Sequence, residues 1–264
     1  MNHGDAKNFR SLQNGRLMTH REWENSSRDS RSLSKLTIIN GLNNVREFMD
    51  TVAARRQMVD QQIRTWEVLD PRVLDVLAEV PREAFVPPAY RELAFADAPI
   101  PIGFGQSMLA PLLQGRILQA LGLNSAESVL EVGTGTGYLT ACLGLLTSAT
   151  HSIDIRPEFT ATAGVNLRAV PQVRVHLETR DALHADSFGE YDVIALTGSL
   201  PVYDTRFEKA LRVGGRLFAV VGSAPTMDAI LVRRVDSNEW IRESLFETVI
   251  DPLTNATPVQ GFVF

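Results

Sequence analysis

Residues 129–141 read VLEVGTGTGYLTA, and this stretch decides the fold of the chain. The apolar run before Gly133 is typical of a buried strand, and the apolar residues from Tyr138 onward are typical of a helix. Glycines at positions 133, 135 and 137 allow a tight turn between them and let a ligand approach the main chain closely. The stretch therefore predicts a strand, a ligand-binding loop and a helix.

Strand and helix patterns alternate from this motif to the C-terminal part of the chain. Such alternation is typical of a parallel sheet with helices on both faces. The last two strands face each other across a turn at Ser237-Asn238 and predict a hairpin. The fold class is therefore α/β, a Rossmann-like doubly wound, mostly parallel sheet with an antiparallel C-terminal hairpin. Strands are predicted at 128–133, 149–155, 173–181, 191–198, 214–222, 228–236 and 240–250, and helices at 138–146, 157–170 and 205–211.

Two further helices are predicted ahead of this core, where they would pack on it or cover it. Asp70 and Pro71 are typical of an N-cap followed by proline at the first helical position of the second helix. Residues 87–103 contain too many prolines for a helix or a central strand and predict an extended connector. The apolar positions that define one face are Met58, Ile63 and Trp66 in the first helix and Val73, Leu74, Leu77 and Val80 in the second.

Residues 1–48 differ in texture from the rest of the chain. They are rich in Ser, Arg and Asn and show no sustained apolar period, which predicts a mostly disordered extension. Met49 opens the well-patterned part, so translation is hypothesised to start there. The expected domain spans residues 49–264, with N-terminal helices and a substrate-side connector over 49–111 and the Rossmann-like core over 112–264.

Composition excludes several classes of protein. The net charge of -5 and the pI near 5.6 argue against nucleic acid as a partner. No apolar span is long enough to cross a membrane. The single cysteine, Cys142, is expected to be a small buried helix residue in a cytoplasmic protein. No metal is expected, because CxxC and His-rich spacings are missing, and His151, His176 and His184 are interpreted as surface or strand residues.

The glycine motif also indicates a cofactor. It reads GxGxG rather than the dinucleotide pattern GxGxxG, and Glu131 precedes it. A nearby carboxylate suits the sulfonium and amino groups of S-adenosylmethionine better than a pyrophosphate. Asp154 is placed to accept hydrogen bonds from ribose hydroxyls, and Asp181 to bind the adenine amino group. The predicted cofactor-binding residues are Glu131, Gly133, Thr134, Gly135, Gly137, Asp154, Ile155, Asp181, Ala182 and Thr197.

Five stretches between about Met58 and Val221 together match the pattern of one known family, which is more specific than the glycine motif alone. In chain order they are MVDQQIR (58–64), VPREAFVP (80–87), LAFADAPIPIGFGQSM (93–108), VLEVGTGTGYLTA (129–141) and LRVGGRLFAVVG (211–222). Together they resemble the protein-L-isoaspartate O-methyltransferases. The resemblance implies a seven-stranded class I methyltransferase fold, S-adenosylmethionine as the methyl donor, and methylation of isoaspartyl carboxylates in damaged proteins or peptides. We expect the protein to be a monomer.

The chemistry of the residues is compatible with that resemblance. A carboxylate with a pKa of about 4 is already ionised at neutral pH, so methyl transfer to it needs no general base. The protein must instead align the carboxylate with the methyl donor and exclude water. This agrees with a sequence that shows no Ser-His-Asp or metal-binding signature.

One position departs from the family pattern. The segment GQSMLAP matches a stretch in which the family has a serine that is expected to orient the substrate carboxylate, and Leu109 stands at that position. A leucine side chain donates no hydrogen bond and would only desolvate a carboxylate. Ser107, two residues earlier, would face the same volume in an extended segment, and Gln106 is a further candidate donor. Thr197 and Ser199 add hydroxyls at the carboxyl edge of the sheet.

Four functions remain compatible with these residues to different degrees. The leading hypothesis is an isoaspartyl methyltransferase whose catalytic segment contains Gln106, Ser107 and the substituted Leu109. The first alternative is a methyltransferase that acts on a changed, less polar substrate. The second is a non-catalytic S-adenosylmethionine-binding protein. The GxGxG spacing and Glu131 disfavour the fourth, a nicotinamide-dependent dehydrogenase.

Overall fold

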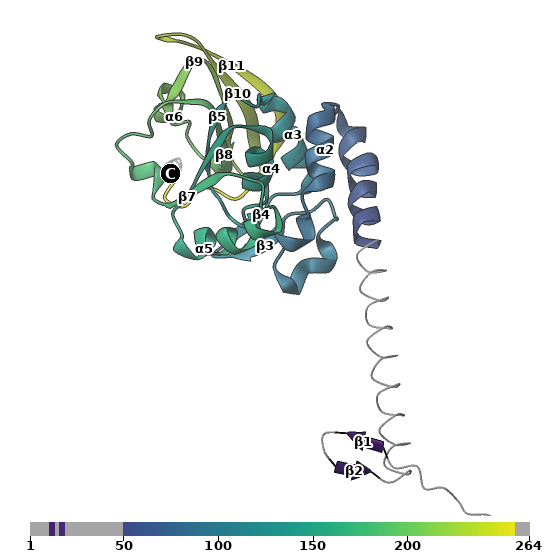
Figure 1. Cartoon of the computed structure of the whole chain (residues 1–264). Coiled ribbons are helices and arrows are strands. Elements are labelled where there is room, and N and C mark those ends of the chain that lie inside the picture. The colour runs from purple at the N-terminus through teal and green to yellow at the C-terminus, as the bar shows by residue number, and fades with distance from the viewer. Residues whose placement is uncertain (1–10, 14–15, 19–49, 257–264) are drawn as a thin grey trace, which may run out of the picture. The chain divides into compact units, whose positions relative to one another are not determined.

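The computed structural model describes residues 11–13, 16–18 and 50–256 (Figure 1). The chain divides into two units, Met1–Ala53 and Ala54–Phe264. In the first unit, β1 (Ser11–Gln13) and β2 (Arg16–Met18) pair antiparallel, although the composition of this region predicted disorder. The overlooked signal is the Asn14-Gly15 dipeptide between them, because Asn-Gly favours two-residue hairpins. The rest of the predicted extension lies outside the described residues.

A seven-stranded sheet forms the centre of the second unit, in the order β11-β10-β9-β8-β5-β6-β7 (Figure 1). The neighbours from β9 to β7 in that order are parallel, whereas β10 pairs antiparallel with β9 and with β11. This confirms the predicted fold class, including the C-terminal hairpin. The strands are β5 (Ser128–Val132), β6 (Ala149–Asp154), β7 (Val175–Thr179), β8 (Tyr191–Leu200), β9 (Leu211–Ser223), β10 (Thr226–Asp236) and β11 (Glu239–Thr248).

Helices cover both faces of the sheet and create two apolar cores. Successive strand residues point to opposite faces, so Val193 packs in the core that contains Leu77 of α2, whereas Ile194 packs in the core that contains Phe207 of α6. Near-continuous apolar strands such as β8 are explained by this burial on both faces. The helices are α2 (Pro71–Glu79), α3 (Pro111–Leu121), α4 (Tyr138–Leu146), α5 (Pro157–Asn166) and α6 (Thr205–Lys209), with short turns η5 (Leu167–Ala169) and η6 (Ala182–His184).

The two predicted helices ahead of the core are present. Residues 50–58 are helical and continue as the π turn η1 (Val59–Ile63) and the 3-10 turn η2 (Arg64–Trp66). The Asp70 side chain accepts a hydrogen bond from the Arg72 backbone N–H at the start of α2, as predicted. The prediction that Trp66 belongs to the apolar face of the first helix is wrong, because Trp66 is 63% exposed. The change from π to 3-10 winding turns it away from the face that Met58 and Ile63 share.

The proline-rich connector is less extended than predicted. It contains the 3-10 turn η4 (Pro88–Leu93) and the strand β3 (Ile100–Gly103), which pairs antiparallel with β4 (Gln106–Met108) just beyond it. Another 3-10 turn, η3 (Arg82–Ala84), precedes the connector. Pro88 is the first residue of η4, where its restricted φ suits a helical turn. None of the described helices is long and apolar enough to cross a membrane.

Candidate active site

The glycine loop follows β5 at the carboxyl end of the parallel strands. Gly133, Gly135 and Gly137 all have positive φ, at 103, 52 and 85°. A Cβ atom at Gly133 would lie 2.2 Å from Thr197 Oγ1, and one at Gly137 would lie 2.9 Å from the Cβ of Ala163. Glycine is therefore required at 133 and 137 by close packing as well as by the backbone conformation.

A cavity opens beside this loop, at the edge of the sheet where doubly wound folds bind ligands. Its wall contains residues from the carboxyl ends of β5, β6 and β8 together with residues of β4. Most of the predicted site residues meet here, although they come from distant parts of the sequence. Those that line the cavity are Gln106, Ser107, Gly133, Gly135, Asp154, Ile155, Asp181, Ala182 and Thr197.

Asp154 ends β6 and joins it to the glycine loop. Its Oδ2 accepts a hydrogen bond of 3.0 Å from the Gly135 N–H, and its Oδ1 accepts one of 3.0 Å from the Arg156 N–H. Burial raises the pKa of this carboxyl, while these backbone hydrogen bonds oppose the shift. Each oxygen keeps a further lone pair, so the carboxylate can hold the loop and still accept a ligand hydroxyl.

Asp181 also lines this cavity. Its Oδ1 accepts a hydrogen bond from the Leu183 N–H at 2.9 Å, and its Oδ2 accepts one from Asn255 Nδ2 at 2.8 Å. Partial burial opposes ionisation, but hydrogen bonds from Asn255 and His184 prevail and lower the pKa of Asp181. His184 Nδ1 lies 2.7 Å from the same Oδ2.

Glu131, Thr134 and Gly137 are the predicted cofactor-binding residues that do not line the cavity. Glu131 is 0% exposed, and its Oε2 accepts hydrogen bonds from Thr140 Oγ1 at 2.5 Å and Ser152 Oγ at 2.6 Å. The Thr134 hydroxyl joins the same network through Ser152. Glu131 Oε1 is buried without a hydrogen-bond partner, and burial raises the pKa of the carboxyl to about 7. These polar groups support the loop from beneath.

A second cavity of about 490 Å³ shares Ser107 of β4 with the first. Ser107 lines both cavities and therefore stands between them, whereas Leu109 lines the second cavity alone. This agrees with the expectation that Ser107 and Leu109 face the same volume. Among the described residues, no partner hydrogen-bonds the Ser107 hydroxyl. The second cavity is also lined by Arg116 of α3 and by residues 246–252 of the C-terminal segment.

The C-terminal segment is fastened to the carboxyl end of β8 and to β4. The Ser199 hydroxyl donates to the Ile250 carbonyl at 3.3 Å, and Gln106 Nε2 donates to the Pro252 carbonyl at 3.1 Å. Ser199 is fully buried and is therefore used by the chain itself, not by a ligand as its place after a strand suggested. The Thr197 hydroxyl likewise lies 2.6 Å from the Gly133 carbonyl oxygen, which it holds in the loop. The closing residues GFVF (261–264) lie outside the described residues.

Arg82 is a site-building residue that no pattern in the sequence indicated. Its side chain is fully buried and donates to the Ala94 and Leu109 carbonyl oxygens at 2.8 Å and to Gln114 Oε1. Its guanidinium also lies over the Tyr138 ring, 4.8 Å from the centroid. Burial lowers its pKa. Arg82 belongs to the VPREAFVP stretch that contributed to the family likeness, but spacing alone did not show that it reaches Leu109.

The fold and the cavities together define a Rossmann-like α/β protein that binds a ligand at the carboxyl edge of its sheet. The family described as protein-L-isoaspartate(D-aspartate) O-methyltransferase matches residues 53–257. The chain belongs to this family.

Individual relatives agree with that assignment. A protein-L-isoaspartate O-methyltransferase of Koribacter versatilis is 35% identical over 201 residues, which cover 75% of this chain and 90% of the relative. One of Anaeromyxobacter dehalogenans is 38% identical over 195 residues, covering 72% and 93%. A Plasmodium falciparum structure described as a putative protein-L-isoaspartate O-methyltransferase, in complex with S-adenosyl-L-homocysteine, has the same fold. It has a TM-score of 0.67 at 16% identity and covers 76% of this chain and 98% of its own.

Proposed function

We propose that this protein transfers a methyl group from S-adenosylmethionine to the carboxylate of isoaspartyl residues in damaged proteins or peptides. The observation that carries this proposal is the position of Ser107 between two cavities. One cavity fits a methyl donor and the other fits an acceptor side chain, so the reacting atoms would meet beside Ser107. Membership of the family supports both the reaction and the acceptor.

The first cavity suits S-adenosylmethionine. The loop brings backbone to the cavity wall at Gly133 and Gly135, where a larger residue would not fit or would be strained. Asp154 would accept hydrogen bonds from the ribose hydroxyls, and Asp181 would accept one from the adenine amino group. Ile155 and Ala182 supply apolar wall for the base. When bound, the cofactor supplies an electrophilic methyl group.

Glu131 would act on the cofactor from beneath the loop. Its carboxyl is separated from the cavity but belongs to the hydrogen-bonded network that reaches Thr134 in the glycine loop. Burial raises the pKa of the Glu131 carboxyl to about 7. A cation bound nearby would favour the charged form of this carboxyl. We infer that the Glu131 carboxylate stabilises the positively charged methyl donor by electrostatic attraction, without contacting it.

The second cavity would hold the acceptor. Among the described residues that line it, Arg116 carries the one positive charge, and Asp97, Glu247 and Asp251 carry negative charges. The Arg116 guanidinium lies 3.5 Å from the centroid of the Phe246 ring, which fixes its orientation. We infer that Arg116 attracts the acceptor carboxylate and that the Ser107 hydroxyl orients it. Leu109 covers the carboxylate on one side and excludes water.

No proton has to move in this reaction. The acceptor carboxylate is ionised at neutral pH, a new C–O bond forms and the C–S bond of the donor breaks. The protein contributes alignment of the carboxylate oxygen with the methyl group and removal of water from both.

The proposal is tested by incubating the full chain with methyl-labelled S-adenosylmethionine and an isoaspartyl peptide. The same peptide with normal aspartate is the control acceptor. Base-labile methyl ester is expected on the isoaspartyl peptide alone. Calorimetric binding of the cofactor without any ester on the isoaspartyl peptide would disprove the isoaspartyl proposal.

One observation supports a second candidate function. Leu109 replaces a polar side chain in the acceptor cavity, where it is 8% exposed, and this favours a less polar methyl acceptor. In that case the labelled cofactor would bind with unchanged affinity, the isoaspartyl peptide would remain unmodified, and small apolar carboxylic acids would accept the label.

We further infer that residues 49–264 form the methyltransferase domain and that the protein works as a monomer in the cytoplasm. Cys142 is free and fully buried on α4, and burial raises the pKa of its thiol to about 12. Such a thiol is unreactive and fits its predicted role as a small core residue.

A further inference from the structure

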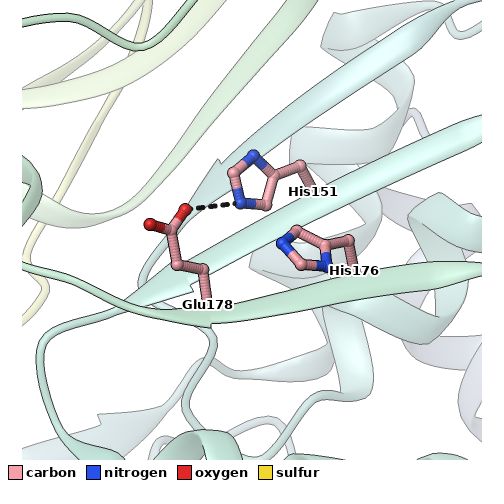
Figure 2. Close-up of side chains that lie close together, drawn as sticks. All are labelled: His151, His176 and Glu178. Carbon is pink, nitrogen blue, oxygen red and sulfur yellow. Dashed lines mark ion pairs between the residues drawn. The ribbon is translucent and has the colours of Figure 1, made fainter.

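A cluster of two histidines and a glutamate lies on the sheet, apart from both cavities. His151 belongs to β6, and His176 and Glu178 belong to β7. Figure 2 shows the three side chains on adjacent strands, pointing toward a common space. One nitrogen or oxygen from each residue lies within 4.8 Å of those of the other two. These residues line neither cavity, and the proposed methyl transfer does not use them.

The strand register produces this cluster. His151 pairs with His176 across the parallel strands, and Glu178 follows His176 by two residues, so all three side chains share one face. Leu177 points to the opposite face, where a Cβ atom at Gly164 of α5 would lie 3.8 Å from its Cδ1. The sequence spacing alone did not reveal a site, because the two histidines are 25 positions apart on separate strands.

The interatomic distances suit a metal ion after a small adjustment. His151 Nε2 lies 2.9 Å from Glu178 Oε2. Ligand atoms around a tetrahedral zinc are about 3.4 Å apart, given bonds of about 2.0–2.1 Å. Closing the widest separation of 4.8 Å to that value needs a rotation of the exposed His176 side chain relative to the His151 ring, whose centroid lies 4.8 Å from its own. The remaining coordination position would face water.

Hydrogen bonding leaves the required lone pairs available. His151 Nδ1 lies 2.7 Å from the Tyr191 hydroxyl, which can fix the orientation of the ring. His151 Nε2 is buried and has no partner with hydrogen-bond geometry, although Glu178 is close. Arg180 Nη1 lies 3.8 Å from Glu178 Oε1, so Oε2 stays directed at the histidines.

We propose that His151, His176 and Glu178 form a binding site for one divalent transition-metal ion of the zinc type. Two imidazoles and a carboxylate are a donor set that zinc accepts, with water completing the shell. The bound ion would join the edge strand β7 to β6, whose last residue, Asp154, lines the cofactor cavity. The site would therefore stabilise the strand that carries the ribose-binding carboxylate.

The test is Zn²⁺ binding to the full chain, measured by calorimetry and by the absorption spectrum of the Co²⁺-substituted protein. One ion per chain is expected, with a spectrum of nitrogen and oxygen ligands. His176→Phe keeps a ring beside His151 but removes a ligand, and Glu178→Gln keeps the shape but removes the charge. Each is expected to weaken Zn²⁺ binding at least tenfold. Zn²⁺ should also raise the Tm of the wild-type protein and leave that of His176→Phe unchanged.

A matched control separates this site from other histidines of the chain. The double variant His3→Gln/His20→Gln removes two imidazoles outside the described residues and is expected to bind Zn²⁺ as tightly as the wild-type protein. Circular dichroism of each variant establishes that it is folded. The proposal is overturned if His176→Phe and Glu178→Gln bind Zn²⁺ as tightly as the wild-type protein, or if the double variant alone abolishes binding.

Discussion

Arg82 Nη2 donates a hydrogen bond of 2.8 Å to the backbone carbonyl oxygen of Leu109. The main chain at position 109 is therefore held by a buried guanidinium, while the side chain lines the acceptor cavity. The identity of the side chain at 109 can change without loss of this anchor, because the bond uses only the backbone. The anchor and the side chain can accordingly be tested separately.

Leu109→Ser tests the side chain. Because Arg82 keeps the backbone in place, the new hydroxyl would enter the acceptor cavity on the same side as Ser107. We expect kcat/KM for an isoaspartyl peptide to rise about tenfold, equivalent to one hydrogen bond to a charged group of about 1.4 kcal/mol. Leu109→Ala is the control, since it opens the same space without a donor. An equal rise in both variants would show that volume, not hydrogen bonding, limits the reaction.

Arg82→Met tests the anchor. This change would leave the carbonyl oxygens of Ala94 and Leu109 without their donors inside the core. Leaving a buried acceptor without its donor costs about 1–3 kcal/mol, so the free energy of unfolding in urea should fall by at least that amount. Arg91→Met changes an exposed arginine of η4 and should unfold like the wild-type protein. An equal fall in the free energy of unfolding in both variants would argue against Arg82 as a specific anchor of the backbone at Leu109.

Arg82 and Leu109 also show why part of the site can be predicted from the sequence and part cannot. Alternation of strands and helices predicted the sheet, and the glycine loop, Asp154 and Asp181 were found because each lies at or just beyond the end of a strand. Carboxyl ends of parallel strands meet at one edge, so chain position alone placed these residues together. Arg82 reaches Leu109 across 27 positions and through irregular turns, and no periodic pattern encodes such a contact.

Other corrections have equally local causes. The π turn at Val59–Ile63 shifted Trp66 out of the face that a regular helix would have produced. Ser199 was predicted to place a hydroxyl at the ligand-binding edge of the sheet, but this hydroxyl donates to the Ile250 carbonyl oxygen. That use depends on where the C-terminal segment returns to the sheet, and the pairing of Ser199 with Pro252 is a long-range contact.

Glu131→Gln should change how stability depends on pH. Burial raises the pKa of Glu131 from 4.5 to about 7 in the folded protein. Between those values the folded state binds the proton more tightly than the unfolded state, so stability of the wild-type protein falls as pH rises. Glutamine does not titrate, so Glu131→Gln should not show this fall in stability as pH rises. In urea unfolding, the free energy of unfolding of Glu131→Gln relative to that of the wild-type protein should rise by about 3 kcal/mol between about pH 5 and pH 8.

Glu127→Gln is the control for that measurement, because the pKa of Glu127 is shifted in the opposite direction from that of Glu131. Hydrogen bonds from Arg216 and from the Asn124 N–H, which outweigh partial burial, lower the pKa of Glu127. Its contribution to stability is present above the unfolded pKa and is lost on acidification. Glu127→Gln should therefore be less stable than the wild-type protein at pH 8, and this difference should shrink as pH falls. Parallel pH profiles for Glu131→Gln and the wild-type protein would contradict a raised pKa at Glu131.

Asp154→Asn should weaken cofactor binding. The neutral amide accepts hydrogen bonds from ribose hydroxyls less strongly, and it keeps only one oxygen for Gly135 and Arg156. We expect the free energy of S-adenosylmethionine binding in calorimetry to weaken by about 1–3 kcal/mol. Asp192→Asn is the matched control, because Asp192 accepts from the Ser128 N–H at 2.8 Å and lines neither cavity. Equal affinities for Asp154→Asn and the wild-type protein would remove Asp154 from the site.

Arg116→Gln should separate acceptor binding from cofactor binding. Arg116 lines the acceptor cavity and is absent from the lining of the cofactor cavity. Loss of its charge should raise KM for the isoaspartyl peptide about tenfold, or about 1.4 kcal/mol, and leave the Kd for S-adenosylmethionine unchanged. Arg116→Lys keeps the charge but not the planar stack on Phe246, so it should restore part of the lost affinity. If instead the Kd for the cofactor rises and KM for the peptide does not, Arg116 serves the fold and the acceptor must be bound elsewhere.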